Sequence, residues 1–195
     1  MSMSKFEASF EDATCTAPRE RRVFVDVKFT SEEWPQLLSV GLVSEDGLEC
    51  YVELDLESAI GQQRVALSSP FVLTQVLSQW GRDLMSGEVT QDLGFKAAGW
   101  LHRLAEHLGC DLALVYTDKR HADLLADALK AAGPIRWPRV APRLRWSIVP
   151  CSQAESSVAA AMARAWARSR EAEGIGQHHA LADARALAAG LRAMH

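Results

Sequence analysis

The sequence predicts an α/β fold with one mixed five-stranded sheet flanked by helices. Two observations support this prediction. The first quarter of the chain carries short runs of β-branched and aromatic residues, which are typical of strands joined by turns. The rest combines apolar patterns of helical period with two short strand-like runs. The 195 residues are 48% hydrophobic and 24% charged, so we expect a soluble globular domain with a core of ordinary size.

Three strands are expected first, as an antiparallel meander. Residues 22–29 (RVFVDVKF) form the first β-branched and aromatic run, and a polar break at Pro35 follows it. Residues 37–44 (LLSVGLVS) and 48–54 (LECYVEL) form the next two runs. The acidic turn with a glycine at residues 45–47 (EDG) is typical of a hairpin connection between such strands.

The remaining elements alternate between helices and strands. The run at 111–117 (DLALVYT) is continuously apolar, as in a buried parallel strand. No internal repeat divides the chain, so we expect a single domain over residues 21–195, preceded by a polar arm over residues 1–20. The expected helices span 71–80, 93–108, 121–132, 154–170 and 180–194, and the last strand spans 143–149.

Composition narrows the compartment and excludes several classes of protein. Charged residues interrupt every apolar stretch, so no membrane span is expected, and the first residues lack the apolar segment of a secretory signal. The four cysteines are scattered without a CxxC pair, which argues against zinc or disulfides and favours a cytoplasmic protein. The net charge of −4 argues against a surface covered in basic patches.

Acidic residues near strand ends are the first candidates for chemistry. Asp26 lies in the first strand, Asp118 and Asp123 follow the fourth strand, and the segment 178–183 (HHALAD) combines two histidines with an aspartate. Each has a plainer interpretation. Asp26 suits a turn, Asp118 suits a helix cap, Asp123 suits the first turn of a helix, and a histidine pair suits a solvated helix start.

Taken together, these residues resemble the DEDDh 3′–5′ exonucleases, a branch of the RNase H-like superfamily. The resemblance covers roughly residues 22–193. Its most specific part is 178–187 (HHALADARAL), which is close to the family's H-x-A-x-x-D-A motif. The hairpin at 37–47 (LLSVGLVSEDG) and the segment 117–125 (TDKRHADLL) resemble a small bacterial exoribonuclease-like subgroup.

The resemblance implies a single RNase H-like domain that shortens single-stranded RNA or DNA from its 3′ end, with RNA favoured. In the family, carboxylates hold two Mg²⁺ or Mn²⁺ ions that drive phosphodiester hydrolysis. Carried over, Asp26, Asp123 and Asp183 would be metal ligands and His178 the general base.

Lys28 departs from the family, which has glutamate two residues after the first aspartate. Residues i and i+2 of a strand share a face, so the ammonium points where the glutamate would bind metal. A unit charge about 4 Å away is worth on the order of 4 kcal/mol at an effective dielectric of 20, which weakens a second metal. The ammonium can instead pair with Asp26 or Asp183.

Three interpretations therefore stay open. The chain is an active exonuclease with a compensating acid, for which Glu32 and Glu33 are candidates, or with a one-metal mechanism. Alternatively, it is a catalytically impaired exonuclease-like protein that binds nucleic acid or a protein partner. The third interpretation is an unrelated α/β fold whose acids resemble the family by chance.

A basic stripe suggests a nucleic-acid surface. Residues 133–170 contain seven arginines and a single acid, Glu155. Arg136 and Arg139 flank Trp137, a combination that suits phosphate contacts and base stacking, although a solvated surface is the plainer interpretation. The apolar stripe along residues 158–166 is typical of a core helix and leaves room for a homodimer.

Overall fold

The structure of the protein is a computed structural model that describes residues 20–81, 90–149 and 156–194. The arm expected over residues 1–20 lies, except for its last residue, outside the described residues. One five-stranded sheet organises the described part of the chain, in the order β3-β2-β1-β4-β5.

The sheet is mixed in the predicted way. Strands β1 (Arg21–Phe29), β2 (Leu37–Ser44) and β3 (Glu49–Glu53) form an antiparallel meander. Strand β4 (Leu112–Tyr116) pairs in parallel with β1, and β5 (Leu144–Ile148) pairs in parallel with β4. The predicted α/β class with one mixed five-stranded sheet is therefore confirmed, and the arrangement is consistent with a single RNase H-like domain.

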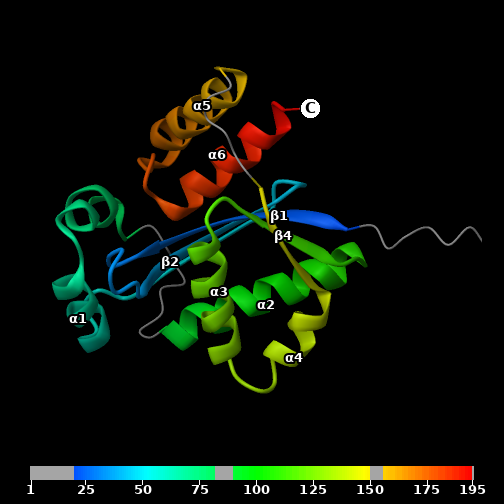
Figure 1. Ribbon diagram of the computed structural model, residues 1–195, viewed down its shortest axis with the longest axis horizontal. Helices are drawn as coiled ribbons and strands as arrows, with labels where there is room; N and C mark the ends of the chain where they lie inside the picture. The colour runs from blue at the N-terminus through cyan, green and yellow to red at the C-terminus, as the bar shows by residue number, and fades with distance from the viewer. Residues whose placement is uncertain (1–19, 82–89, 150–155, 195) are drawn as a thin grey trace, which may run out of the picture.

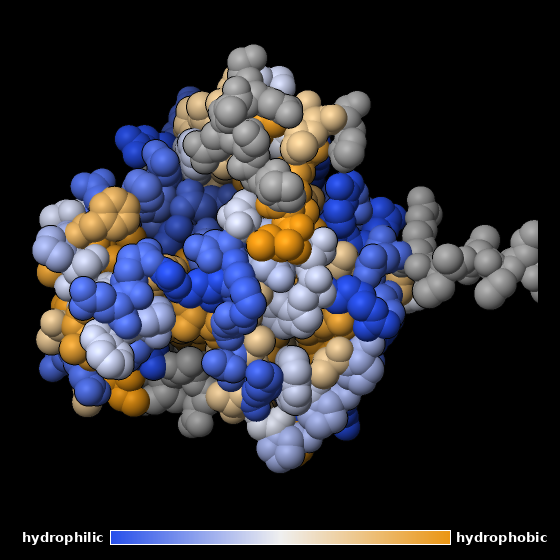
Figure 2. All heavy atoms as spheres, viewed as in Figure 1, coloured by the Kyte–Doolittle hydropathy of each residue, from blue (hydrophilic) through white to orange (hydrophobic). Residues whose placement is uncertain are grey.

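Helices cover both faces of this sheet (Figure 1). Helices α2 (Thr90–Leu108), α3 (Lys119–Ala131) and α4 (Trp137–Val140) lie on one face, and α5 (Ser156–Glu173) and α6 (Ala180–Arg192) lie on the other. Figure 2 shows that the outer surface in this view is mostly hydrophilic, with smaller apolar areas between the polar ones. Among the described helices, none is long and apolar enough to cross a membrane.

Strand β1 divides its side chains between the two apolar layers. Val23, Val25 and Val27 belong to the core beneath α2 and α3, and Phe24 belongs to the layer beneath α6. Because side chains alternate along a strand, the even-numbered residues of β1 face α6.

The segment between β3 and α2 differs from the prediction. Helix α1 (Ala59–Leu67) was not expected, because it buries only Gly61 and so carries no apolar stripe that a sequence pattern could reveal. The helix expected over 71–80 is instead a π-helical turn (η1, Val72–Val76) followed by a 3₁₀ turn (η2, Leu77–Gln79). The four-residue spacing of Val72 and Val76 buries both residues without a regular α-helix.

The chain before β5 also contains unexpected helical turns. Helix α4 and a 3₁₀ turn (η3, Ala141–Arg143) both carry proline in their first residues, where its missing N–H is tolerated. The ends of the other helices and strands agree with the predicted ends to within about three residues.

Candidate functional site

Strand β1 places Asp26 and Lys28 on the face covered by α6. Asp26 pairs in register with Gly41 on β2. A Cβ atom at Gly41 would overlap the backbone of Ala180 at the start of α6, so only glycine allows the helix to approach so closely. Gly41 therefore brings the start of α6 against the strand residues that flank Asp26.

The Lys28 ammonium bridges two carboxylates, Asp26 and Asp183, that are far apart in the sequence and adjacent in space. Asp26 is its neighbour on β1, and Asp183 comes 155 residues after Lys28 in the sequence. The Nζ atom of Lys28 lies 2.7 Å from Oδ2 of Asp26 and 2.6 Å from Oδ2 of Asp183. The three side chains are 12–14% exposed, so the bridge is largely shielded from water.

Burial and charge act in opposite directions on these groups. Burial raises the pKa of Asp26 above its ordinary value, and the charge of Lys28 offsets only part of that rise. Burial alone would lower the pKa of Lys28, but the charges of Asp26 and Asp183 outweigh it and raise the pKa above its ordinary value. Lys28 is therefore firmly charged at neutral pH, and its predicted pairing with a carboxylate is confirmed for both partners.

Donors also surround Asp183 on its other side. The indole Nε1 of Trp166 on α5 donates to Oδ1 at 2.7 Å, and the backbone N–H of His178 donates to the two carboxylate oxygens at 3.3 and 3.1 Å. His178 has a φ of 73°, a left-handed conformation that is uncommon for a residue other than glycine. The strained turn aims the N–H of His178 at Asp183.

His121 on α3, and not Asp123, lies beside Asp26. Its Nδ1 is 3.4 Å from Oδ1 of Asp26. The Asp123 side chain is 60% exposed, and both of its oxygens accept hydrogen bonds from Lys119. The structure thus does not bring Asp123 to Asp26 and Asp183, because it lies on the side of α3 away from the buried positions.

The loop after β1 supplies no further acid to the centre. Glu32 is 75% exposed and pairs with Arg120, and Glu33 is exposed on the same loop. Within the described ranges, no group of three or more His, Cys, Asp or Glu residues is arranged to hold a metal ion. Asp118, the remaining acid of this region, caps α3 by accepting from the N–H of Arg120 at 2.8 Å, as predicted.

Two pockets of about 390 Å³ each open beside the lysine bridge. One is lined by Asp26, Trp166, His178 and Asp183, and it brings three of the predicted site residues together. The other is more apolar and is lined by Lys28, Phe29, Phe71, Val72, Val76 and His121, among others. The rings of Phe71 and His178 meet edge to face between them, with centroids 4.9 Å apart.

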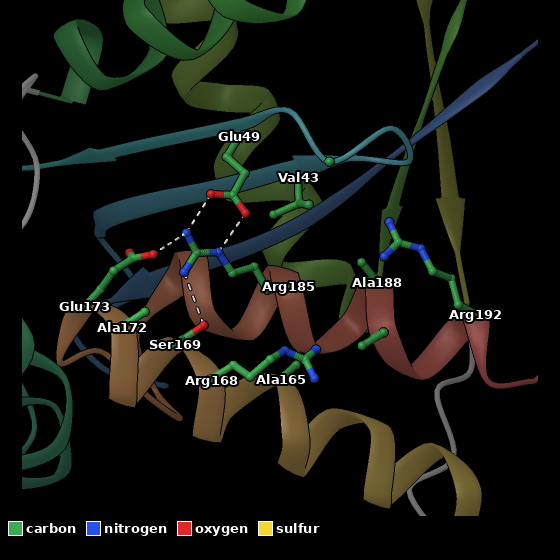
Figure 3. Close-up of a pocket in the computed structure, with 12 residues that line it drawn as sticks. Val43, Glu49, Ala165, Arg168, Ser169, Ala172, Glu173, Arg185, Ala188 and Arg192 are labelled. Atoms are coloured by element: carbon green, nitrogen blue, oxygen red, sulfur yellow. Dashed lines mark hydrogen bonds and ion pairs between the residues drawn. The ribbon is translucent and has the colours of Figure 1, made fainter.

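Arg185, two residues after Asp183, anchors α6 to its neighbours (Figure 3). Its guanidinium donates to both oxygens of Glu49 at 2.7 and 2.6 Å, lies 2.9 Å from Glu173, and donates to Ser169 at 3.2 Å. The hydrogen bonds that Arg185 donates to Glu49 and Glu173 raise its pKa above its ordinary value. This clamp fixes the helix that carries Asp183 against α5 and β3.

The basic stripe lies apart from this centre. Arg136, Trp137 and Arg139 belong to the turn and helix that precede β5, and the start of β5 pairs with the start of β4. Thr117, which lines the Asp26 pocket, follows the opposite end of β4. Trp137 is partly buried against the core.

Sequence reasoning missed His121 and Trp166. His121 shares a helix face with Ala128, so the helical phase of α3 was the available signal. Trp166 belonged to an apolar stripe typical of a core helix and stood among the aromatics of the basic stripe, and neither pattern pointed to Asp183, although a buried indole N–H normally requires an acceptor. In comparisons with known proteins, no family model matches the chain, and no curated protein matches it.

Proposed function

We propose that the protein is an exonuclease-like protein that binds the 3′ end of single-stranded nucleic acid without two-metal hydrolysis. The observation that carries the proposal is the Lys28 ammonium, which lies within 2.7 Å of both Asp26 and Asp183. The choice of a single strand, and of its 3′ end, as the ligand rests on the resemblance to the DEDDh exonucleases. We assign the protein to the cytoplasm, since its scattered cysteines fit a reducing compartment.

The residues present do not fit a pair of divalent cations. Magnesium needs oxygen ligands at about 2.0–2.1 Å, in near-octahedral geometry. Here the ammonium engages Oδ2 of both carboxylates, while Trp166 and His178 donate to the other side of Asp183. The third position beside Asp26 is a histidine rather than an acid.

The same arrangement favours binding a nucleotide. Lys28 cancels one of the two carboxylate charges, so a phosphate meets less repulsion than it would beside two bare acids. The apolar pocket with Phe29 and Phe71 offers aromatic surface to a base, and stacking of this kind tolerates any base. Because the cation is a side chain, binding is expected without added metal.

The test is fluorescence anisotropy of 5′-labelled single-stranded RNA and DNA. The native protein should bind equally in EDTA and in magnesium, and blocking the 3′ end with a phosphate should weaken binding. Lys28→Met, assayed at a temperature at which its thermal unfolding curve shows it to be folded, should weaken it further, whereas Lys119→Met, the same change at an exposed lysine, should not. Binding that requires magnesium, or that ignores the 3′ end, would contradict the proposal.

An active 3′–5′ exonuclease with Mg²⁺ or Mn²⁺ is the second candidate. It is favoured by the pocket that Asp26, His178 and Asp183 line together. The labelled strands are incubated with manganese and the native protein, Lys28→Glu or Asp183→Ala. A 3′-shortening ladder from the native protein, abolished by Asp183→Ala, would establish the exonuclease. A ladder from Lys28→Glu alone would support the binding proposal.

A further inference from the structure

A further pocket, on the opposite face of the sheet from α6, is lined by arginines and by no described acidic residue. It lies between α2 and α4 and has a volume of about 290 Å³. Arg103, Arg136 and Arg139 line it, together with His102 and the exposed Ile135. None of the described residues that line it is Asp or Glu. The nearby Glu106 is 60% exposed and pairs with His102.

Two of these guanidinium groups converge on Gly99. A Cβ atom at Gly99 would overlap Nη1 of Arg136 and lie 3.5 Å from Nη1 of Arg103. The Arg136 guanidinium is also stacked on the ring of Phe95, 3.6 Å from its centroid. The space at Gly99 and the ring of Phe95 thus place the guanidinium of Arg136 close to that of Arg103.

Like charges held this close repel each other, and an anion between them relieves the repulsion. Guanidinium groups match the oxygen geometry of a phosphate and can bind it through two parallel hydrogen bonds. We propose that the α2–α4 pocket binds a phosphate group of a nucleic-acid strand. The proposal of a phosphate pocket depends on these contacts alone. That the bound strand is the one whose 3′ end lies at Lys28 rests on the proposed function.

The position of the pocket sets the length of strand required. The pocket lies beside the segment leading into β5, at the start of β4, whereas the Lys28 centre lies beyond the end of β4. The five residues of β4, at about 3.3 Å each, therefore separate the pocket from the Lys28 centre by roughly 15 Å or more. A nucleic-acid strand whose 3′ end lies at Lys28 must therefore extend for several nucleotides to reach Arg103.

The pocket of Figure 3 is a weaker candidate for the same role. It also contains three arginines, but Arg185 is already paired with Glu49 and Glu173. Its charge is therefore largely compensated within the protein, in contrast to the α2–α4 pocket.

The experiment compares two double variants with the same change of charge. Arg103→Ala with Arg139→Ala alters the α2–α4 pocket, and Arg164→Ala with Arg168→Ala alters exposed positions of α5, of which Arg168 lines the weaker candidate pocket of Figure 3. All four side chains are exposed, so both variants should fold, and thermal unfolding checks this. Anisotropy is measured with a 20-nucleotide RNA, a 4-nucleotide RNA and AMP, over a series of salt concentrations.

The pocket variant should bind the 20-nucleotide RNA about tenfold or more weakly, and the slope of log K against log salt concentration should fall by about 0.7, the value for one lost phosphate contact on a single strand. The α5 control should keep both values closer to native, and the 4-nucleotide RNA should not distinguish the variants. Equal losses of RNA affinity in both double variants, or no loss in the pocket variant, would refute the proposal that the pocket binds phosphate. A loss of affinity confined to AMP would identify a free nucleotide as the ligand and refute binding of a strand.

The two proposals fail separately in this design. A loss of RNA affinity in the arginine variant but not in Lys28→Met would support the phosphate pocket and refute the end-binding function. The reverse result would leave the end-binding function standing and refute the pocket.

Discussion

Replacing Lys28 with methionine should strongly destabilise the protein, because it leaves Asp26 and Asp183 buried without a cation. In a medium of effective dielectric 20, each of the two ion pairs, at 2.6–2.7 Å, contributes about 6 kcal/mol. Removing the ammonium also removes its desolvation cost of several kcal/mol. The net loss should be about 3–5 kcal/mol, the range for breaking a buried ion pair and a large fraction of the roughly 5–15 kcal/mol that stabilises a domain.

The loss should depend on pH in a defined direction. Without Lys28, only the weaker effect of His121 opposes the burial and the Asp183 charge that raise the pKa of Asp26. A carboxyl group with a raised folded-state pKa binds more protons when folded than when unfolded, so stability increases as the pH falls through that pKa toward 3.8. The difference between Lys28→Met and the native protein should therefore shrink as the pH is lowered from about 8 to about 5.

Urea denaturation at several pH values measures both effects. Lys119→Met is the matched control, since Lys119 also pairs with an aspartate but its side chain is 76% exposed. That variant should change the free energy of unfolding little at any pH. A loss below about 1 kcal/mol in Lys28→Met, or the same loss at every pH, would refute the reasoning.

Three further predictions concern the same centre. Gly41→Ala should lower the free energy of unfolding by about 1–3 kcal/mol, because the added Cβ displaces α6; an unchanged denaturation midpoint would contradict this close approach. His178→Asn should be more stable than His178→Val by about 1–2 kcal/mol, since asparagine tolerates the left-handed backbone; equal melting temperatures would argue against strain. The raised pKa of Lys28 means that its stabilisation is present below pH 10.5 and is lost as the pH rises through the folded-state pKa, so alkaline denaturation should narrow the gap to Lys28→Met.

The sheet was predictable because its strands carry their own signals. The β-branched runs and the continuous apolar strand β4 mark the strands, and the glycine turn at 45–47 determines the pairing of β2 with β3 locally. Helix α1 gave no such signal, because most of its surface faces water. The π-helical turn at η1 buries the same residues that an α-helix would, so spacing alone does not separate the two.

The candidate site was predictable where a motif fixes both residue type and position. Asp26, His178 and Asp183 meet in one pocket, as the resemblance to the DEDDh exonucleases implies. Asp123 does not join them, because two residues along a helix turn a side chain by about 200°, and His121 faces Asp26 instead. The double pairing of Lys28 required the position of α6, which depends on tertiary packing against Gly41.

The long sequence separation within the lysine bridge affects how the protein is made. Asp183 is synthesised 155 residues after Lys28, so a nascent chain contains Lys28 and Asp26 long before α6 leaves the ribosome. Contacts between such distant segments form late, because a large loop must close first. Folding intermediates that lack a docked α6 should keep Lys28 exposed to water, and the centre should assemble as one of the last steps of folding.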